Sequence, residues 1–266
     1  MLNHWSAGQL NDVLDCPKYF YDKRVKEVRQ PPFGYVVGRG SAVDRILTAA
    51  VMGQVVDIKE DGPQIVTDYL REVESDEAHG WVERVIYEGD KTREFIEEAL
   101  SLADFYWNKH KDKKWISAQL EADGDLAGVP FRGIIDGIYL DKSGNTVIVD
   151  WKVRERNERR FSDAVQLSCY YWWWYNRFKT RPLIAIHAII PPTKKNPNIR
   201  AEVNTFLPLP YNFIQEVVQI WESYSMPPIH TGVGMKNINS WRCKDNFCGS
   251  FHECSFGNAR YLARGR

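Results

Sequence analysis

Two carboxylates and a lysine in the middle of the chain have the types and spacing needed to hydrolyse a phosphodiester. Asp136 lies within an apolar, β-branched run, and Asp150 and Lys152 end the next such run. Side chains two positions apart on a strand point to the same face, so Asp150 and Lys152 are expected side by side. Residues 141–145, between the runs, have the composition of a hairpin turn. The pattern predicts that the three side chains converge at one end of a β-hairpin.

Such a group suits a divalent cation. Mg²⁺ takes oxygen ligands and is often held by one or two carboxylates, which leaves positions for water and a phosphate. A neighbouring lysine could orient or deprotonate the attacking water, or stabilise the charge of the transition state. The alternative is a hairpin with an exposed ion pair, because an isolated Asp-x-Lys is common.

Three motifs in chain order resemble the PD-(D/E)XK nuclease superfamily. They are a Gly-x-x-Asp that ends at Asp136, an apolar strand that ends in Asp150-x-Lys152, and Gln166-x-x-x-Tyr170 on the next helix. More narrowly, they resemble the RecB-like branch, which includes phage exonucleases and CRISPR-associated adaptation exonucleases. The resemblance implies a Mg²⁺- or Mn²⁺-dependent deoxyribonuclease. It also implies an α/β, restriction-endonuclease-like core: a central mixed β-sheet flanked by helices, with a helical N-terminal part and a Cys-rich C-terminal segment.

The resemblance assigns roles to these residues. Asp136 and Asp150 match the first and second metal ligands, and Lys152 matches the catalytic lysine. Gln166 and Tyr170 match the helix motif that lies beside the DNA backbone.

Three further metal ligands follow from the same resemblance. Asp44, on a helix expected over residues 38–51, stands where the family has the histidine of Gly-x-x-x-His. A carboxylate there would serve Mg²⁺ or Mn²⁺, or it could be a solvated partner of Arg45. Trp151 is expected to lend its backbone carbonyl. Glu121 ends a strand at a position where the family often has an acidic residue near the metal, or it is an edge-strand carboxylate.

The cysteines resemble the iron–sulfur layout of several RecB-like proteins, with one N-terminal and three C-terminal ligands. Here these are Cys16, Cys243, Cys248 and Cys254. The resemblance implies a [4Fe–4S] cluster, although four residues rather than the usual two separate the first pair of the trio. Zn²⁺ is the rival, since His252 lies inside the trio, and free thiols are the third possibility.

A basic run follows the Asp-x-Lys strand. Its arginines, Arg154, Arg156, Arg159 and Arg160, could contact DNA phosphates. The same run could also be an ordinary exposed loop.

Hydrophobic periodicity predicts the remaining elements. Helices are expected over residues 38–51, 63–77, 91–111, 163–178 and 211–224, and further strands over residues 115–121, 183–190 and 199–207. The prediction is a single nuclease domain over residues 1–266, with a mostly helical part at 1–112, the core at 113–210, and a C-terminal part at 211–266 that packs back on the N-terminus.

Composition limits the function classes. The 266 residues are 44% hydrophobic and include 35 basic and 35 acidic side chains. A neutral chain must hold nucleic acid through a local patch. No apolar run reaches the roughly 18 residues of a membrane span, and the N-terminus lacks the pattern of a secretory signal. We therefore expect no membrane partner and a cytoplasmic protein of a bacterial or phage-infected cell.

The expected partner is DNA, as single- or double-stranded ends. A homo-oligomer or partner proteins of recombination, repair or CRISPR-type adaptation are compatible with the sequence. Two alternatives remain: a non-catalytic DNA-binding or assembly module on the same fold, and a redox-sensing iron–sulfur DNA-binding protein.

Overall fold

The computed structural model describes residues 2–28, 35–74 and 92–225. Its helices are α1 (Ala7–Asp15), α2 (Pro17–Phe20), the π-helix η1 (Tyr21–Val25), α3 (Tyr35–Val51), α4 (Ile58–Glu74), α5 (Thr92–His110), α6 (Phe161–Phe178) and α7 (Tyr211–Ser225). Its strands are β1 (Lys114–Leu126), β2 (Val129–Leu140), β3 (Thr146–Val153), β4 (Leu183–Ile190) and β5 (Arg200–Phe206). The chain forms two compact units.

The larger unit, whose described parts are residues 35–74, 92–122 and 133–208, is built on the sheet. The strand order is β1-β2-β3-β4-β5. β2 pairs antiparallel with β3, β3 parallel with β4, and β4 antiparallel with β5. The parallel pair needs a crossover, which α6 supplies.

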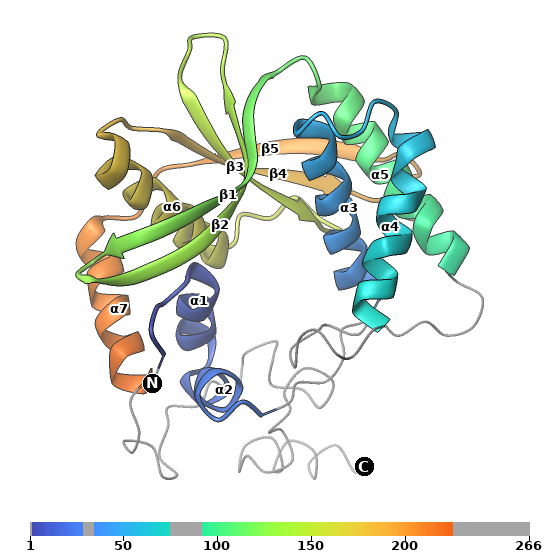
Figure 1. Ribbon diagram of the computed structural model, residues 1–266. Coiled ribbons are helices and arrows are strands. Elements are labelled where there is room, and N and C mark those ends of the chain that lie inside the picture. The colour runs from blue at the N-terminus through green and yellow to red at the C-terminus, as the bar shows by residue number, and fades with distance from the viewer. Residues whose placement is uncertain (1, 29–34, 75–91, 226–266) are drawn as a thin grey trace. The chain divides into compact units, whose positions relative to one another are not determined.

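Helices cover both faces of this sheet (Figure 1). α3, α4 and α5 pack together and share a hydrophobic core with Val147, Val149 and Trp151 of β3. Because side chains alternate along a strand, Asp150 faces the other way. It faces α6, which contacts β3 and β4.

The smaller unit comprises residues 2–28, 123–132 and 209–225 among those described. Trp5 forms a parallel bridge with Phe131, and α7 packs against α1, where the Trp221 indole donates to Gln9 Oε1 at 3.0 Å. Ser6 caps α1 by accepting from Gln9 N at 3.2 Å. α1 ends at Asp15, Cys16 is its C-cap, and α2 begins at Pro17.

The predicted α/β class, a mixed sheet flanked by helices, is confirmed. Two boundaries differ clearly. β1 runs on to Leu126, so Glu121 lies inside the strand and not at its end as predicted. α4 begins at Ile58, not near Pro63. Asp57 caps the earlier start by accepting from Lys59 N at 2.7 Å. A single domain over residues 1–266 stays a prediction, because the Cys-rich C-terminal segment lies outside the described residues.

Candidate active site

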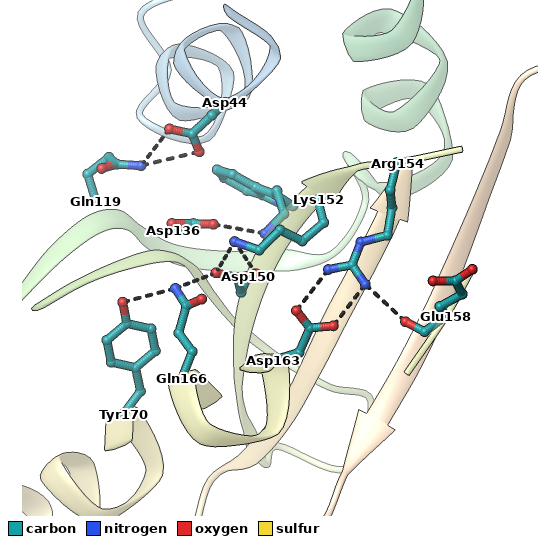
Figure 2. A network of polar contacts seen from close by, with 11 residues as sticks. Asp44, Gln119, Asp136, Asp150, Lys152, Arg154, Glu158, Asp163, Gln166 and Tyr170 are labelled. Carbon is teal, nitrogen blue, oxygen red and sulfur yellow. Dashed lines mark hydrogen bonds and ion pairs between the residues drawn. The ribbon is translucent and has the colours of Figure 1, made fainter. Parts of the chain in front are cut away.

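The β2–β3 pairing sets Asp136 opposite Asp150. Gly137 pairs with Val149, and continuing the antiparallel register by one residue brings the two aspartates together. Asp136 Oδ2 accepts a hydrogen bond from Trp151 N at 2.9 Å. Gly137 is needed beside it because a Cβ there would lie 2.9 Å from the Trp151 indole. The strands thus bring the two carboxylates into one small region (Figure 2).

Lys152 joins Asp150 on the same face of β3. Its Nζ lies 2.8 Å from Asp150 Oδ1 and 2.7 Å from Oδ2. The Asp150 side chain is fully buried, whereas one-third of the Lys152 side chain is exposed. The lysine can therefore reach both a buried carboxylate and a molecule that arrives from solvent.

Helix α6 adds two residues of the predicted motif. Gln166 Nε2 donates to Asp150 Oδ1 at 2.8 Å and to the Tyr170 hydroxyl at 3.3 Å. Residues four apart lie on one helix face, so the Gln-x-x-x-Tyr spacing places both side chains toward β3. The amide fixes the orientation of the Asp150 carboxylate.

A buried ion pair fastens α6 to the end of β3. Arg154 donates to both carboxylate oxygens of Asp163, at 2.8 and 3.0 Å, and to the Glu158 carbonyl at 3.0 Å. Both charged side chains are almost completely buried. The pair holds the first turn of α6 next to the strand that carries Asp150 and Lys152.

Asp44 reaches the same region from α3. Its carboxylate oxygens accept from Gln119 Nε2 at 3.3 and 3.1 Å. Gln119 lies in β1 with a φ of 50°, a left-handed conformation that is strained for a residue other than glycine. Gln119, the strained residue, therefore hydrogen-bonds Asp44, which is a predicted metal ligand.

Burial and mutual repulsion shift the acid–base properties of the group. Burial raises the pKa of Asp44 to about 6, with a further contribution from Asp150. Burial and the Asp150 charge raise the pKa of Asp136 well above its usual value. Burial also raises the pKa of Asp150, against the opposing effect of Lys152. Burial alone would lower the pKa of Lys152, but Asp150 and Asp136 outweigh it, so the pKa is raised and the ammonium keeps its proton.

Within the described ranges, no group of three or more His, Cys, Asp or Glu side chains is arranged so that it could hold a metal ion. The oxygens of Asp136 and Asp150 contact protein donors instead. Their chemistry nevertheless fits Mg²⁺ or Mn²⁺, which prefer carboxylate oxygens. Asp150 Oδ2 is buried and, among the described residues, has its ion pair with Lys152 but no hydrogen bond. The carboxylate lies in an acidic group whose ionisation a divalent cation would favour.

The other two predicted metal ligands, Trp151 and Glu121, differ in burial. Trp151 packs its side chain in the core, where the indole donates to the Tyr106 hydroxyl at 2.9 Å. A metal contact by its carbonyl stays a prediction. Glu121 is exposed on β1, and its role as a ligand also stays a prediction.

The four arginines of the basic run do not share one environment. Arg154 is buried and bound to Asp163, so its guanidinium is not available to a phosphate. Arg156, Arg159 and Arg160 are exposed. Arg159 lies over the Phe206 ring at 5.8 Å. DNA contact by these three stays a prediction.

Of the four cysteines predicted to hold a cluster, Cys16 lies among the described residues. Cys16 is a free, partly buried cysteine at the start of α2. Cys243, Cys248 and Cys254 lie outside the described residues, as does His252. The cluster and its zinc alternative therefore stay predictions.

Sequence reasoning missed Gln119 and Asp163. The bend that turns Gln119 toward Asp44 has no glycine to mark it. Asp163 could have been found as an acidic residue in the first turn of the helix that follows the basic run.

A five-stranded mixed sheet with an Asp/Asp/Lys group beside a Gln-x-x-x-Tyr helix is the framework of a restriction-endonuclease-like nuclease. The model of the PD-(D/E)XK nuclease superfamily matches residues 4–250. The chain belongs to this superfamily.

Two solved structures are similar to the chain. The crystal structure of a candidate exonuclease from Eubacterium rectale is 13% identical, with a TM-score of 0.50, and the match covers 83% of this chain and 78% of that one. At this identity the likeness shows the fold alone. The crystal structure of SSO0001 is also 13% identical and covers 96% of this chain and 87% of its own, but its TM-score of 0.43 is too low to support a fold argument. A search of curated proteins found no match.

Proposed function

We propose that the chain is a Mg²⁺- or Mn²⁺-dependent deoxyribonuclease of the RecB-like branch that acts as an exonuclease. The observation that carries this proposal is the buried Asp150 carboxylate, held by Lys152 and Gln166 beside Asp136. An Asp-x-Lys on an ordinary exposed hairpin would not be buried or held by a helix amide.

The metal would be held by Asp44, Asp136 and Asp150, with the Trp151 carbonyl and Glu121 as further proposed ligands. When bound, it supplies a Lewis acid that lowers the pKa of water and neutralises developing negative charge.

The chain's own groups then have distinct tasks. Lys152 keeps its proton, so it donates to the water or stabilises charge on the phosphate. Gln166 orients Asp150, and its partner Tyr170 is buried against it. Exposed Arg156, Arg159 and Arg160 would contact the DNA backbone.

Partners and cofactors are proposed on the RecB-like resemblance. The substrate would be single- or double-stranded DNA ends in recombination, repair or CRISPR-type adaptation. DNA as the substrate favours action in the cytoplasm. A [4Fe–4S] cluster on Cys16 and the three C-terminal cysteines, or Zn²⁺ in its place, would link the two ends of the chain.

In the part of the chain that the structure describes, no helix is long and apolar enough to cross a membrane.

The test uses anaerobically purified protein on end-labelled linear and closed circular DNA, single- and double-stranded. Each substrate is incubated with Mg²⁺, Mn²⁺ or EDTA. We expect metal-dependent loss of linear DNA with circles spared. Cutting of closed circles would contradict the exonuclease assignment, and tight DNA binding without any cleavage would favour the binding-module alternative.

A further inference from the structure

A cavity of about 590 Å³ opens beside the candidate active site, with Asp44 and Gln119 in its wall. The volume lies in the range of small-molecule sites, which is roughly 300–1,000 Å³. Thr48 and Ala49 of α3, Gln54 and Ile65 complete most of its lining. Asp44 therefore belongs both to the carboxylate group and to the wall of a cavity large enough for part of a substrate.

The lining offers neutral hydrogen-bonding groups next to apolar surface. Thr48 Oγ1 is buried and has no hydrogen-bond partner among the residues that the structure describes. A helical threonine can satisfy its hydroxyl with the carbonyl of the preceding turn, but Thr48 does not. Because Thr48 also lines the cavity, a rotation of its side chain about χ1 presents the hydroxyl to a ligand. Gln54 exposes its side chain, while Ala49 and Ile65 supply apolar contact.

The charges around the cavity do not favour a free anion. Arg45, which also lines it, is paired with Glu72 at 2.6 Å and lies over the Tyr69 ring at 4.9 Å. Asp44 adds a carboxylate. Because Arg45 is already compensated by Glu72, the cavity suits a neutral ligand with polar edges and flat apolar faces.

We propose that this cavity is a nucleoside subsite, which receives the base and sugar of the nucleotide that adjoins the scissile phosphate. This inference rests on the proposed nuclease function. The phosphate would lie against the carboxylates and Lys152, and Asp44 joins the two places. Thr48 and Gln54 provide hydrogen bonds to the nucleoside, and Ala49 and Ile65 provide apolar surface for the base.

The test is isothermal titration of the full chain with deoxyadenosine, dAMP and inorganic phosphate, in EDTA and in Mg²⁺. We expect deoxyadenosine to bind with or without metal, and inorganic phosphate not to bind in EDTA. Thr48→Val keeps the side-chain shape and removes the hydroxyl, so it should weaken deoxyadenosine binding about tenfold. Gln54→Ala, at an exposed position, should weaken it severalfold. The matched control is Thr67→Val on α4, whose hydroxyl bonds the Pro63 carbonyl; this variant should bind as the wild type does.

Three binding results would each overturn the assignment: no binding of deoxyadenosine, equal binding by the Thr48→Val and Thr67→Val variants, or phosphate binding in EDTA as tight as that of dAMP. A parallel DNA cleavage assay separates this inference from the function on which it rests. Cleavage with no change in KM for Thr48→Val would reject the subsite and keep the nuclease. Binding that depends on Thr48, in a protein that cleaves no DNA, would keep the nucleoside site and reject the nuclease.

Discussion

Replacing Asp44 by asparagine is expected to stabilise the metal-free protein above about pH 6. Burial raises the pKa of this carboxyl to about 6, and the Asp150 charge adds to the shift, while Lys152 and Arg45 partly oppose it. Ionised Asp44 is therefore a cost to the folded state without metal. Asparagine removes that cost and keeps an oxygen that can accept from Gln119.

The magnitude follows from linkage. The pKa moves from 3.8 to about 6, and each unit corresponds to about 1.4 kcal/mol, which gives an upper limit of about 3 kcal/mol. A raised pKa in the folded state means that protonation stabilises the fold at low pH. This stabilisation is fully present below about pH 4 and is lost as the pH rises through 6. The advantage of Asp44→Asn over the wild type should therefore grow between pH 4 and 6 and then level off.

The assay is urea unfolding of both proteins in EDTA from pH 4 to 8, followed by tryptophan fluorescence. Asp141→Asn is the matched control on the β2–β3 turn. Hydrogen bonds from Asn145 and Ser143 lower the pKa of the exposed Asp141. The stability that this carboxylate contributes is fully present above its usual pKa and is lost only as the pH falls below it, so the free-energy difference between this variant and the wild type should stay nearly constant from pH 4 to 8. If the free-energy difference between Asp44→Asn and the wild type is the same at pH 4 and pH 8, or if Asp44→Asn is less stable at pH 8, the reasoning is refuted.

Two further substitutions test the supports of the site by urea unfolding. Arg154→Leu leaves the Asp163 carboxylate buried without its partner, which should cost about 3–5 kcal/mol. The control Arg160→Leu, at an exposed position, should change stability by less than about 1 kcal/mol. Equal effects of the two would contradict a stabilising role for the buried Arg154–Asp163 ion pair. Tyr106→Phe removes the hydroxyl that accepts from the Trp151 indole and is hydrogen-bonded to His187 Nδ1. The change should cost about 1–3 kcal/mol, so unchanged stability would show that these two buried bonds contribute nothing.

Local patterns were enough to predict the central part of the site. Alternation along β3 places Asp150 and Lys152 on one face, and the turn composition predicts the hairpin that brings Asp136 to them. The four-residue spacing of Gln166 and Tyr170 predicts a shared helix face. Each of these rules acts over a few residues, so sequence reasoning could apply them.

Contacts between distant segments were not predictable in the same way. Gln119 meets Asp44 across 75 positions, through a left-handed strand residue that no glycine marks. Arg154 lies in a run of charged residues whose composition predicts an exposed loop. The structure buries it, because its guanidinium pairs with Asp163 in the next helix. Burial of a charge is set by tertiary packing, which composition does not encode locally.

The most direct test of the central claim is the rate of Mn²⁺-dependent cleavage of end-labelled linear DNA by three variants. Asp150→Asn and Lys152→Ala should each lose at least about 100-fold in rate, because one removes a charged oxygen ligand and the other the ammonium that stabilises the reacting phosphate. Asp141→Asn, on the exposed turn of the same hairpin, should cleave at the wild-type rate. Wild-type cleavage by Asp150→Asn or Lys152→Ala would contradict the assignment of this site.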